Sequence, residues 1–221
     1  MRSDRRSLLA AGFLLSLLPI GRASGQTLPP VAPDELPPGL PQPTETIDLW
    51  PDGAPGLPDS PPVERTVERS SDRLVTDRAV SGIATPRMVV FRPARPNGAA
   101  VLLTPGGGYK HVVVDKEGYE MGRWLAARGV TAFVLFYRLP GDGWEAGPDV
   151  ALSDAQRAMR LIRHRARDYA IEPERVAAMG FSAGGHLCAD LATRFALKTY
   201  TPVDAADALS AKPFCAAPIY P

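Results

Sequence analysis

With 221 residues, 45% of them hydrophobic and 22% charged, the chain is long enough for one domain with a sizeable core. Its formal net charge of +1 gives no electrostatic reason to expect a nucleic acid or an anionic membrane surface as a partner. Proline is unusually frequent, but half of the 24 prolines lie between Pro29 and Pro62, so the excess marks a segment rather than a fold.

Residues 1–25 are predicted to be a secretory signal peptide. Arg2, Arg5 and Arg6 precede a short apolar stretch, residues 8–20, and small residues follow it. Because about 20 apolar residues are needed to cross a bilayer, we expect export to the periplasm or the medium without a stable membrane anchor. The adjacent pair Arg5 and Arg6 also resembles a twin-arginine motif, so the sequence leaves Sec and twin-arginine export open.

Residues 26–62 are predicted to be a proline-rich extended leader, because they contain few bulky apolar side chains. Trp50 is the large aromatic residue of this segment, and we expect it to lay the leader onto the surface of the domain. The pattern changes after the leader, where residues 63–67 and 74–80 are predicted to be short edge strands. Residues 63–221 are therefore expected to form the folded domain.

From residue 88 onward, apolar runs alternate with helical patterns. The apolar runs, which we predict to be strands, cover residues 88–91, 99–103, 130–136, 176–179 and 214–220. The helical patterns cover residues 117–128, 152–169 and 183–197. Continuous apolar strands that alternate with amphipathic helices predict an α/β fold, in which a mostly parallel sheet is covered by helices on both faces.

The two cysteines fall in predicted elements of the fold. Cys188 lies in a helical apolar pattern and Cys215 lies in an apolar strand run. Export would permit a disulfide between them. Free cysteine is nevertheless among the residue types most often buried, so we predict two buried, unpaired thiols.

A serine between two glycines follows a predicted strand and opens the next helix, in the sequence Gly180-Phe181-Ser182-Ala183-Gly184. In this position G-x-S-x-G is typical of a nucleophile elbow, where the glycines permit a tight turn that lifts the hydroxyl above the sheet. The N-terminus of the following helix also favours developing negative charge. An ordinary strand-to-helix turn of small residues could share the pattern, but its place in the alternation favours Ser182 as a nucleophile.

A glycine-rich loop, residues 104–109 (TPGGGY), follows an earlier predicted strand. Acyl transfer passes through a tetrahedral oxyanion, which needs backbone N–H donors placed in advance. Lipases and esterases carry an HGGG-type loop for this purpose, and Pro105 stands here in place of the histidine. A dinucleotide-binding loop would require G-x-G-x-x-G, and His111 occupies the third glycine position. The loop therefore favours an oxyanion hole.

Five motifs extend over nearly all of the chain that follows the predicted signal peptide: residues 49–56 (LWPDGAPG), 105–109 (PGGGY), 115–118 (DKEG), 136–140 (FYRLP) and 180–186 (GFSAGGH). In these motifs the chain resembles the α/β-hydrolase superfamily of the esterase/lipase type, and within it the bacterial acetyl xylan esterase and feruloyl esterase-like branch. The resemblance implies that Ser182 is the nucleophile. It does not decide which of two neighbouring loop glycines donates its N–H to the oxyanion. It also implies elbow glycines and oxyanion N–H donors, namely Gly180 and Gly184 for the elbow, and Gly107, Gly108 and Ala183 for the oxyanion.

The chain differs from that family at its C-terminal end. In these hydrolases the triad Asp or Glu and the triad His follow the serine, on loops after later strands. This chain ends at Pro221, one predicted strand past Ser182. The strand predicted at 214–220 would also leave an apolar edge of the sheet bare. We therefore expect the C-terminal part of the fold, with the triad acid and the triad histidine, to be missing.

The chain contains three histidines, each of which must be weighed against the role of a substitute base. His164 lies on the polar face of the long helix and is expected to be solvated. His186 lies four residues after Ser182, where contact is conceivable, and His111 lies in the loop near the expected oxyanion hole. Neither His186 nor His111 has an evident carboxylate to orient it, so both are weak substitutes.

The favoured hypothesis is an exported serine esterase that hydrolyses a small-molecule or polysaccharide ester, of the acetyl or feruloyl type, through an acyl-enzyme. We expect no cofactor and no metal ion. Residues 1–221 alone are expected to hydrolyse esters negligibly, because the triad acid and base are absent. A non-catalytic pseudo-enzyme or binding module is an alternative, and a prolyl-oligopeptidase-like peptidase is a weaker one, since residues 26–62 are too short for a propeller.

Overall fold

The computed structural model describes residues 41–221. The centre of the fold is a six-stranded sheet in the order β1-β4-β7-β5-β8-β9. The first three strands pair antiparallel, and β7, β5, β8 and β9 are parallel to one another. The strands are β1 Glu45–Asp48, β4 Arg87–Phe91, β5 Ala100–Thr104, β7 Thr131–Phe136, β8 Val176–Phe181 and β9 Ala216–Ile219.

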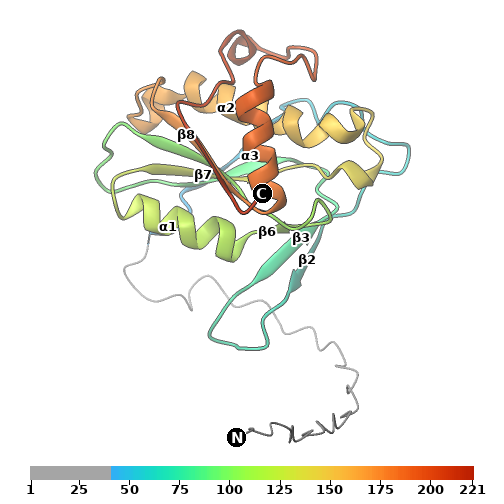
Figure 1. Ribbon diagram of the computed structural model, residues 1–221, viewed down its shortest axis with the longest axis horizontal. Coiled ribbons are helices and arrows are strands. Elements are labelled where there is room, and N and C mark those ends of the chain that lie inside the picture. The colour runs from blue at the N-terminus through green and yellow to red at the C-terminus, as the bar shows by residue number, and fades with distance from the viewer. Residues whose placement is uncertain (1–40) are drawn as a thin grey trace, which may run out of the picture.

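Three α-helices pack on this sheet: α1 Glu120–Ala126, α2 Val150–His164 and α3 Ala183–Arg194. Figure 1 shows α1 on one side of the central strands and α2 on the opposite side. The strands β5 and β7 between them are buried along their whole length. This two-sided burial explains their continuous apolar sequence. The predicted α/β fold with a mostly parallel sheet covered on both faces is confirmed.

The central pair of parallel strands places two loops side by side. Thr104, the last residue of β5, is paired with Gly180 of β8. The chain leaves β5 into the glycine-rich loop and leaves β8 into the turn at Ser182. Because both strands are parallel, these two exits lie at the same carboxyl edge of the sheet, where α/β folds bind their ligands.

The long helix is shorter than its pattern predicted. The apolar face expected over residues 152–169 is buried, but α2 ends at His164 and a separate 3₁₀ turn, Ala166–Tyr169, follows it. The helix expected over residues 117–128 begins instead as a π-helical turn, η2 Asp115–Tyr119, that leads into α1.

Folded structure begins before residue 63, within the segment expected to be an extended leader. Strand β1 pairs antiparallel with β4, and Ile47 is part of the hydrophobic core. Trp50 is buried rather than laid on the surface, and its indole N–H donates to Asp154 Oδ1 at 2.9 Å. An edge strand buries only alternate side chains, so β1 needs few apolar residues and its composition did not distinguish it from a leader.

A second, smaller sheet consists of β2 Arg65–Glu68, β3 Arg78–Ser81 and β6 Val112–Val113, all antiparallel. The strands expected near residues 63–67 and 74–80 therefore exist, but they form a hairpin that projects from the body of the fold in Figure 1 rather than an edge of the central sheet. Strand β6 follows the glycine-rich loop directly, so the small sheet anchors the far end of that loop.

The two cysteines are both free, as predicted, but only Cys188 is buried. The prediction that Cys215 is buried is wrong. It immediately precedes β9, an edge strand whose residues are alternately exposed and half-buried, and the apolar composition of residues 214–220 does not reveal that position. Within residues 41–221 no helix is long and apolar enough to cross a membrane, and the predicted signal peptide lies outside these residues.

Candidate active site

Ser182 sits in a strained turn between β8 and α3, with φ 50° and ψ −125°. The glycines of its motif are required by close backbone contacts. A Cβ on Gly184 would lie 2.0 Å from the carbonyl oxygen of Thr104, and one on Gly180 would lie 2.1 Å from the carbonyl oxygen of Gly184. A non-glycine residue with positive φ costs of the order of 1–3 kcal/mol and is common at functional turns. The predicted strand, tight turn and helix are all present.

Some polar groups of this turn have a hydrogen-bond partner and others have none. The Ser182 N–H donates to the carbonyl oxygen of Ile219 in β9 at 3.0 Å. The Ser182 Oγ and the N–H of Ala183, by contrast, have no hydrogen-bond partner among the described residues. Ala183 is the first residue of α3, whose N-terminal end carries the positive end of the helix dipole. The turn thus offers a half-buried hydroxyl beside a free backbone donor.

The glycine-rich loop lies against this turn. A Cβ on Gly106 would be 3.0 Å from the Cβ of Ser182. The Gly106 N–H is already taken, because it donates to Glu117 Oε2 at 2.6 Å. Gly107 and Gly108 have φ values of 137° and 62°, and within residues 41–221 their N–H groups have no partner. The structure therefore brings together Ser182, Ala183 and the loop glycines implied by the resemblance.

Two tyrosines hold the loop in place. The buried Tyr137 O–H donates to the carbonyl oxygen of Pro105 at 2.7 Å, and burial raises the pKa of Tyr137. Tyr109, at the end of the loop, has φ 57°, and its ring meets that of Tyr137 edge-on. Burial, with a smaller effect from the charge of Asp190, raises the pKa of Tyr109 to about 12. Both tyrosines therefore remain protonated at neutral pH.

Neither weak substitute base is placed like the histidine of a catalytic triad. His186 is exposed, and its Nδ1 lies 2.9 Å from the Tyr109 hydroxyl. His111 is half-buried beside the loop, and burial together with the positive charges of Arg69 and Lys110 lowers its pKa. In the part of the chain that the structure describes, neither imidazole bonds to the Ser182 hydroxyl or to a carboxylate, although the backbone N–H of His186 donates to the Ser182 carbonyl oxygen at 2.9 Å at the start of α3. The exposure of His164 agrees with its expected solvation.

Sequence reasoning gave no role to Glu117 or to Tyr137. Both lie in motifs that carried the family resemblance, DKEG and FYRLP. Their contacts with the glycine-rich loop span 11 and 32 residues of sequence, so no local pattern could have revealed them.

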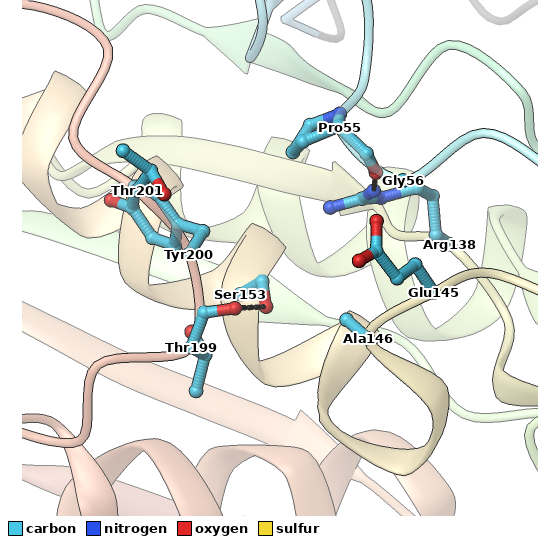
Figure 2. A pocket seen from close by; sticks show the side chains of 9 residues that line it. All are labelled: Pro55, Gly56, Arg138, Glu145, Ala146, Ser153, Thr199, Tyr200 and Thr201. Carbon is cyan, nitrogen blue, oxygen red and sulfur yellow. Dashed lines mark hydrogen bonds between the residues drawn. The ribbon is translucent and has the colours of Figure 1, made fainter.

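An open pocket of about 310 Å³ lies away from Ser182 and is drawn in Figure 2. The Arg138 guanidinium forms part of its wall and donates to the carbonyl oxygen of Pro55 at 2.7 Å. Its opposite side includes Thr199, which comes after the C-terminal end of α3, whereas Ser182 precedes the N-terminal end. The helix between them is about 18 Å long at about 1.5 Å per residue. The free hydroxyl and the backbone donors of the turn make Ser182, rather than this pocket, the candidate active site.

Metal ligands are not gathered anywhere in residues 41–221, where no group of three or more His, Cys, Asp or Glu side chains could hold a metal ion. The expectation of no metal and no cofactor stays a prediction.

A strained serine between a parallel strand and a helix, next to a glycine-rich loop at the carboxyl edge of the same sheet, defines the α/β-hydrolase fold of the esterase type. The chain belongs to the BD-FAE family, whose model matches residues 90–205. The predicted family resemblance is therefore confirmed.

Two named proteins are similar to the chain in sequence. An acetylxylan esterase of Xylanibacter ruminicola is 40% identical over 108 residues, which are 48% of this chain and 22% of that protein. Endo-1,4-beta-xylanase B of Butyrivibrio fibrisolvens is 38% identical over 95 residues, which are 43% of this chain and 15% of that protein. The matches thus cover less than a quarter of either relative.

Solved structures with similar folds include a hydrolase and an esterase. An acetyl ester-xyloside bifunctional hydrolase from Caldicellulosiruptor lactoaceticus aligns with a TM-score of 0.54 and 29% identity, over 79% of this chain and 56% of that one. Esterase Est2 from Thermogutta terrifontis, with propionate bound, aligns with a TM-score of 0.51 and 21% identity, over 72% of this chain and 52% of that one. At that identity the Est2 likeness concerns the fold alone.

Proposed function

We propose that this chain carries the nucleophile and the oxyanion hole of an exported serine carboxylester hydrolase that acts on ester-decorated carbohydrate. One observation carries the proposal. Ser182 is held in a strained strand-to-helix turn against a glycine-rich loop, and within residues 41–221 its hydroxyl and the N–H groups of Gly107 and Gly108 have no partner. Free polar groups at a strained, partly buried turn are unusual unless a ligand or a reacting group occupies the site.

The reaction would follow the acyl-enzyme route. Ser182 Oγ attacks the ester carbonyl carbon, a base takes the hydroxyl proton, and the carbonyl π electrons move to oxygen. The N–H groups of Ala183 and of Gly107 or Gly108 stabilise this oxyanion. Collapse of the intermediate re-forms the carbonyl and breaks the bond from the acyl carbon to the sugar oxygen, and this oxygen takes the proton from the base to leave as a hydroxyl. Water then repeats the attack on the acyl-enzyme and releases the carboxylic acid.

The substrate class comes from the relatives. The sequence relatives are named as an acetylxylan esterase and a xylanase, and the solved structure that aligns with a TM-score of 0.54 is named as an acetyl ester-xyloside hydrolase. An acetyl or feruloyl ester on a xylan-type polysaccharide is therefore the substrate that we propose. The half-exposed loops around Ser182 are suited to a bulky leaving group, because the sugar can remain outside the turn.

The full-length gene product, including any coding sequence beyond Pro221, is the material for the test. Hydrolysis would be measured on p-nitrophenyl acetate, acetylated xylan and methyl ferulate, for the wild type and for Ser182→Ala. We expect Ser182→Ala to lower kcat at least about a thousandfold. The matched control is Ser71→Ala, because Ser71 is exposed in the hairpin loop between β2 and β3. Turnover that survives Ser182→Ala, or a wild type inactive on all three esters, would overturn the proposal, and the latter would favour a binding module.

Residues 1–221 alone are proposed to hydrolyse esters negligibly. Among the described residues Ser182 Oγ lies without a hydrogen-bonded base, and neither His111 nor His186 contacts a carboxylate. The same p-nitrophenyl acetate assay tests this. Turnover by residues 1–221 that disappears in His186→Ala or in His111→Ala would make that histidine the base.

Export rests on the N-terminal sequence, which lies outside the described residues. Mass spectrometry of the protein from a periplasmic fraction should find cleavage after Gly25. Retention of the uncleaved precursor in the cytoplasm after Arg5→Lys and Arg6→Lys together would indicate the twin-arginine route, whereas unchanged export would indicate the Sec route.

A further inference from the structure

A carboxylate links the glycine-rich loop to the end of the strand that follows the nucleophile helix. Glu117 Oε2 accepts the N–H of Gly106 at 2.6 Å, and its Oε1 accepts the O–H of Tyr220 at 3.0 Å. Both carboxylate oxygens are therefore engaged, one by the glycine-rich loop and the other by the residue that follows β9. The two bonds span 11 and 103 residues of sequence.

The position of this carboxylate is close to the expected oxyanion hole. A Cβ placed on Gly106 would lie 2.9 Å from Glu117 Oε2 and 3.0 Å from the Cβ of Ser182. The carboxylate and the candidate nucleophile therefore approach the same glycine. Among the three loop glycines, Gly106 is the one whose N–H is withdrawn from any reacting group, while those of Gly107 and Gly108 stay free within the described chain.

The backbone around Glu117 is held in a fixed, unusual form. Glu117 lies in the π-helical turn Asp115–Tyr119, a form that is rare and often found at functional sites. Asp115, at the start of the turn, is buried and accepts three hydrogen bonds from Arg78 of β3, at 2.6, 2.6 and 2.9 Å. This ion pair, which raises the pKa of Arg78, fixes the turn to the small sheet. Glu117 therefore projects from a rigid support.

We propose that Glu117 is a positioning residue for the esterase reaction, which fixes the glycine-rich loop so that Gly107 and Gly108 present their N–H groups to the oxyanion. The inference rests on the proposed function. A charged acceptor forms a hydrogen bond roughly twice as strong as a neutral one. Consecutive glycines can adopt a wide range of φ and ψ angles. A strong bond at the first glycine, added to the bond from Tyr137 to the Pro105 carbonyl oxygen, narrows that range and so fixes the direction of the donor N–H groups. This positioning role requires only that residue 117 offers an oxygen acceptor to the Gly106 N–H, and it involves no proton transfer.

The test measures kcat, KM and Tm of the full-length gene product on p-nitrophenyl acetate. Glu117→Ala should lower kcat about a hundredfold, the effect of losing one oxyanion donor, while KM changes less than about threefold. Glu117→Gln keeps an oxygen acceptor for the Gly106 N–H and should restore kcat to within about tenfold of the wild type. Tyr220→Phe removes only the second bond and should lower kcat less than Glu117→Ala does. The matched control is Glu120→Ala, an exposed glutamate at the start of α1.

The outcomes separate this inference from the proposed function. If Glu117→Ala keeps the wild-type kcat while Ser182→Ala abolishes turnover, the positioning role is wrong and the esterase proposal stands. Equal losses in Glu117→Ala and Glu117→Gln would also overturn the role, because the acceptor would then not matter. The role would also be wrong if the loss of kcat in Glu117→Ala came only from unfolding. In that case the loss would disappear once the rate is divided by the fraction of protein that is folded at the assay temperature, as obtained from the thermal unfolding curve. Turnover that survives Ser182→Ala would instead overturn the proposed function itself.

Discussion

The turn at Ser182 and the ion pair of Arg138 with Asp154 are two polar regions of the same fold with opposite properties. At the turn, a hydroxyl and several backbone N–H groups are left without partners among the described residues, and the backbone is strained. The ion pair is buried completely, with side chains that are 1% and 0% exposed, and its Asp154 oxygens accept bonds from the side chain and the backbone of Arg138.

The second region connects segments that are distant in sequence. Asp154 in α2 also accepts the indole N–H of Trp50, and Arg138, just after β7, reaches the carbonyl oxygen of Pro55. The Arg138 guanidinium lies over the rings of Trp50 and Trp144, 5.4 and 4.8 Å from their centroids. These contacts attach residues 45–56 to the domain. The buried, paired charges of Arg138 and Asp154 thus stabilise the fold. The unpaired polar groups and the strained backbone at Ser182 instead indicate where the chemistry is expected.

The largest expected effect on stability is at the ion pair. Asp154→Ala should lower the free energy of unfolding by about 3–5 kcal/mol, because Arg138 would keep a buried, uncompensated charge. Urea unfolding of the chain measures this. Asp168→Ala, in a pair whose carboxylate side chain is 56% exposed, is the control and should cost less than about 1 kcal/mol. If both variants lose the same amount, the ion pair does not hold the fold. The double variant Arg138→Met with Asp154→Leu should be more stable than Asp154→Ala.

The next effect concerns the close backbone contact of the turn. Gly184→Ala should destabilise the chain by about 2 kcal/mol or more, because its Cβ would meet the Thr104 carbonyl and force β5 and α3 apart. Gly141→Ala is the matched control, since a Cβ there would have no atom within 4 Å. Its stability should stay the same or rise by up to about 1 kcal/mol. An unaffected Gly184→Ala would show that the turn is not tightly packed.

A smaller effect on stability is expected from the backbone strain at Ser182 itself. Ser182→Gly should be more stable than Ser182→Ala by about 1 kcal/mol, because glycine adopts positive φ without steric cost, although it loses more chain entropy. Both variants lack the hydroxyl, so their difference in urea unfolding isolates the backbone. A Ser182→Ala variant as stable as Ser182→Gly would mean that the turn stores no strain.

The smallest effect is expected at a half-exposed ion pair. Arg157 hydrogen-bonds Asp204 and lowers the pKa of Asp204 from 3.8 to about 2. The stabilisation is therefore complete above pH 4 and lost as the pH falls towards 2. The Asp204 side chain is 42% exposed and Arg157 keeps Asp207 as a second partner, so Asp204→Asn should cost less than about 1 kcal/mol near neutral pH. Urea unfolding at pH 6 and pH 3 should show this cost shrinking at the lower pH. A constant difference would contradict the shifted pKa.

The strands and the turn that the sequence predicted correctly are those whose local residue pattern matches their burial in the fold. The continuous apolar runs of β5, β7 and β8 predicted parallel strands, and GFSAG predicted the turn between strand and helix. Prediction from sequence failed for β1 and for Cys215, because edge strands need few buried side chains and their position in the sheet is not encoded locally. The role of Ser182 as nucleophile, and those of the loop glycines as donors, stay predictions.

The sequence by itself determined the central strands β4, β5, β7 and β8, the helices that follow the last three of them, the family and the serine turn, since each depends on residue periodicity or on glycines at fixed spacing. Only the tertiary structure decided which loop glycines are free to donate, because the Gly106 N–H is taken by Glu117, eleven residues further along the chain. It also decided that Trp50 is buried, through a bond to Asp154 across 104 residues. Periodicity carries information over a few residues, whereas these hydrogen bonds depend on how distant segments meet in space.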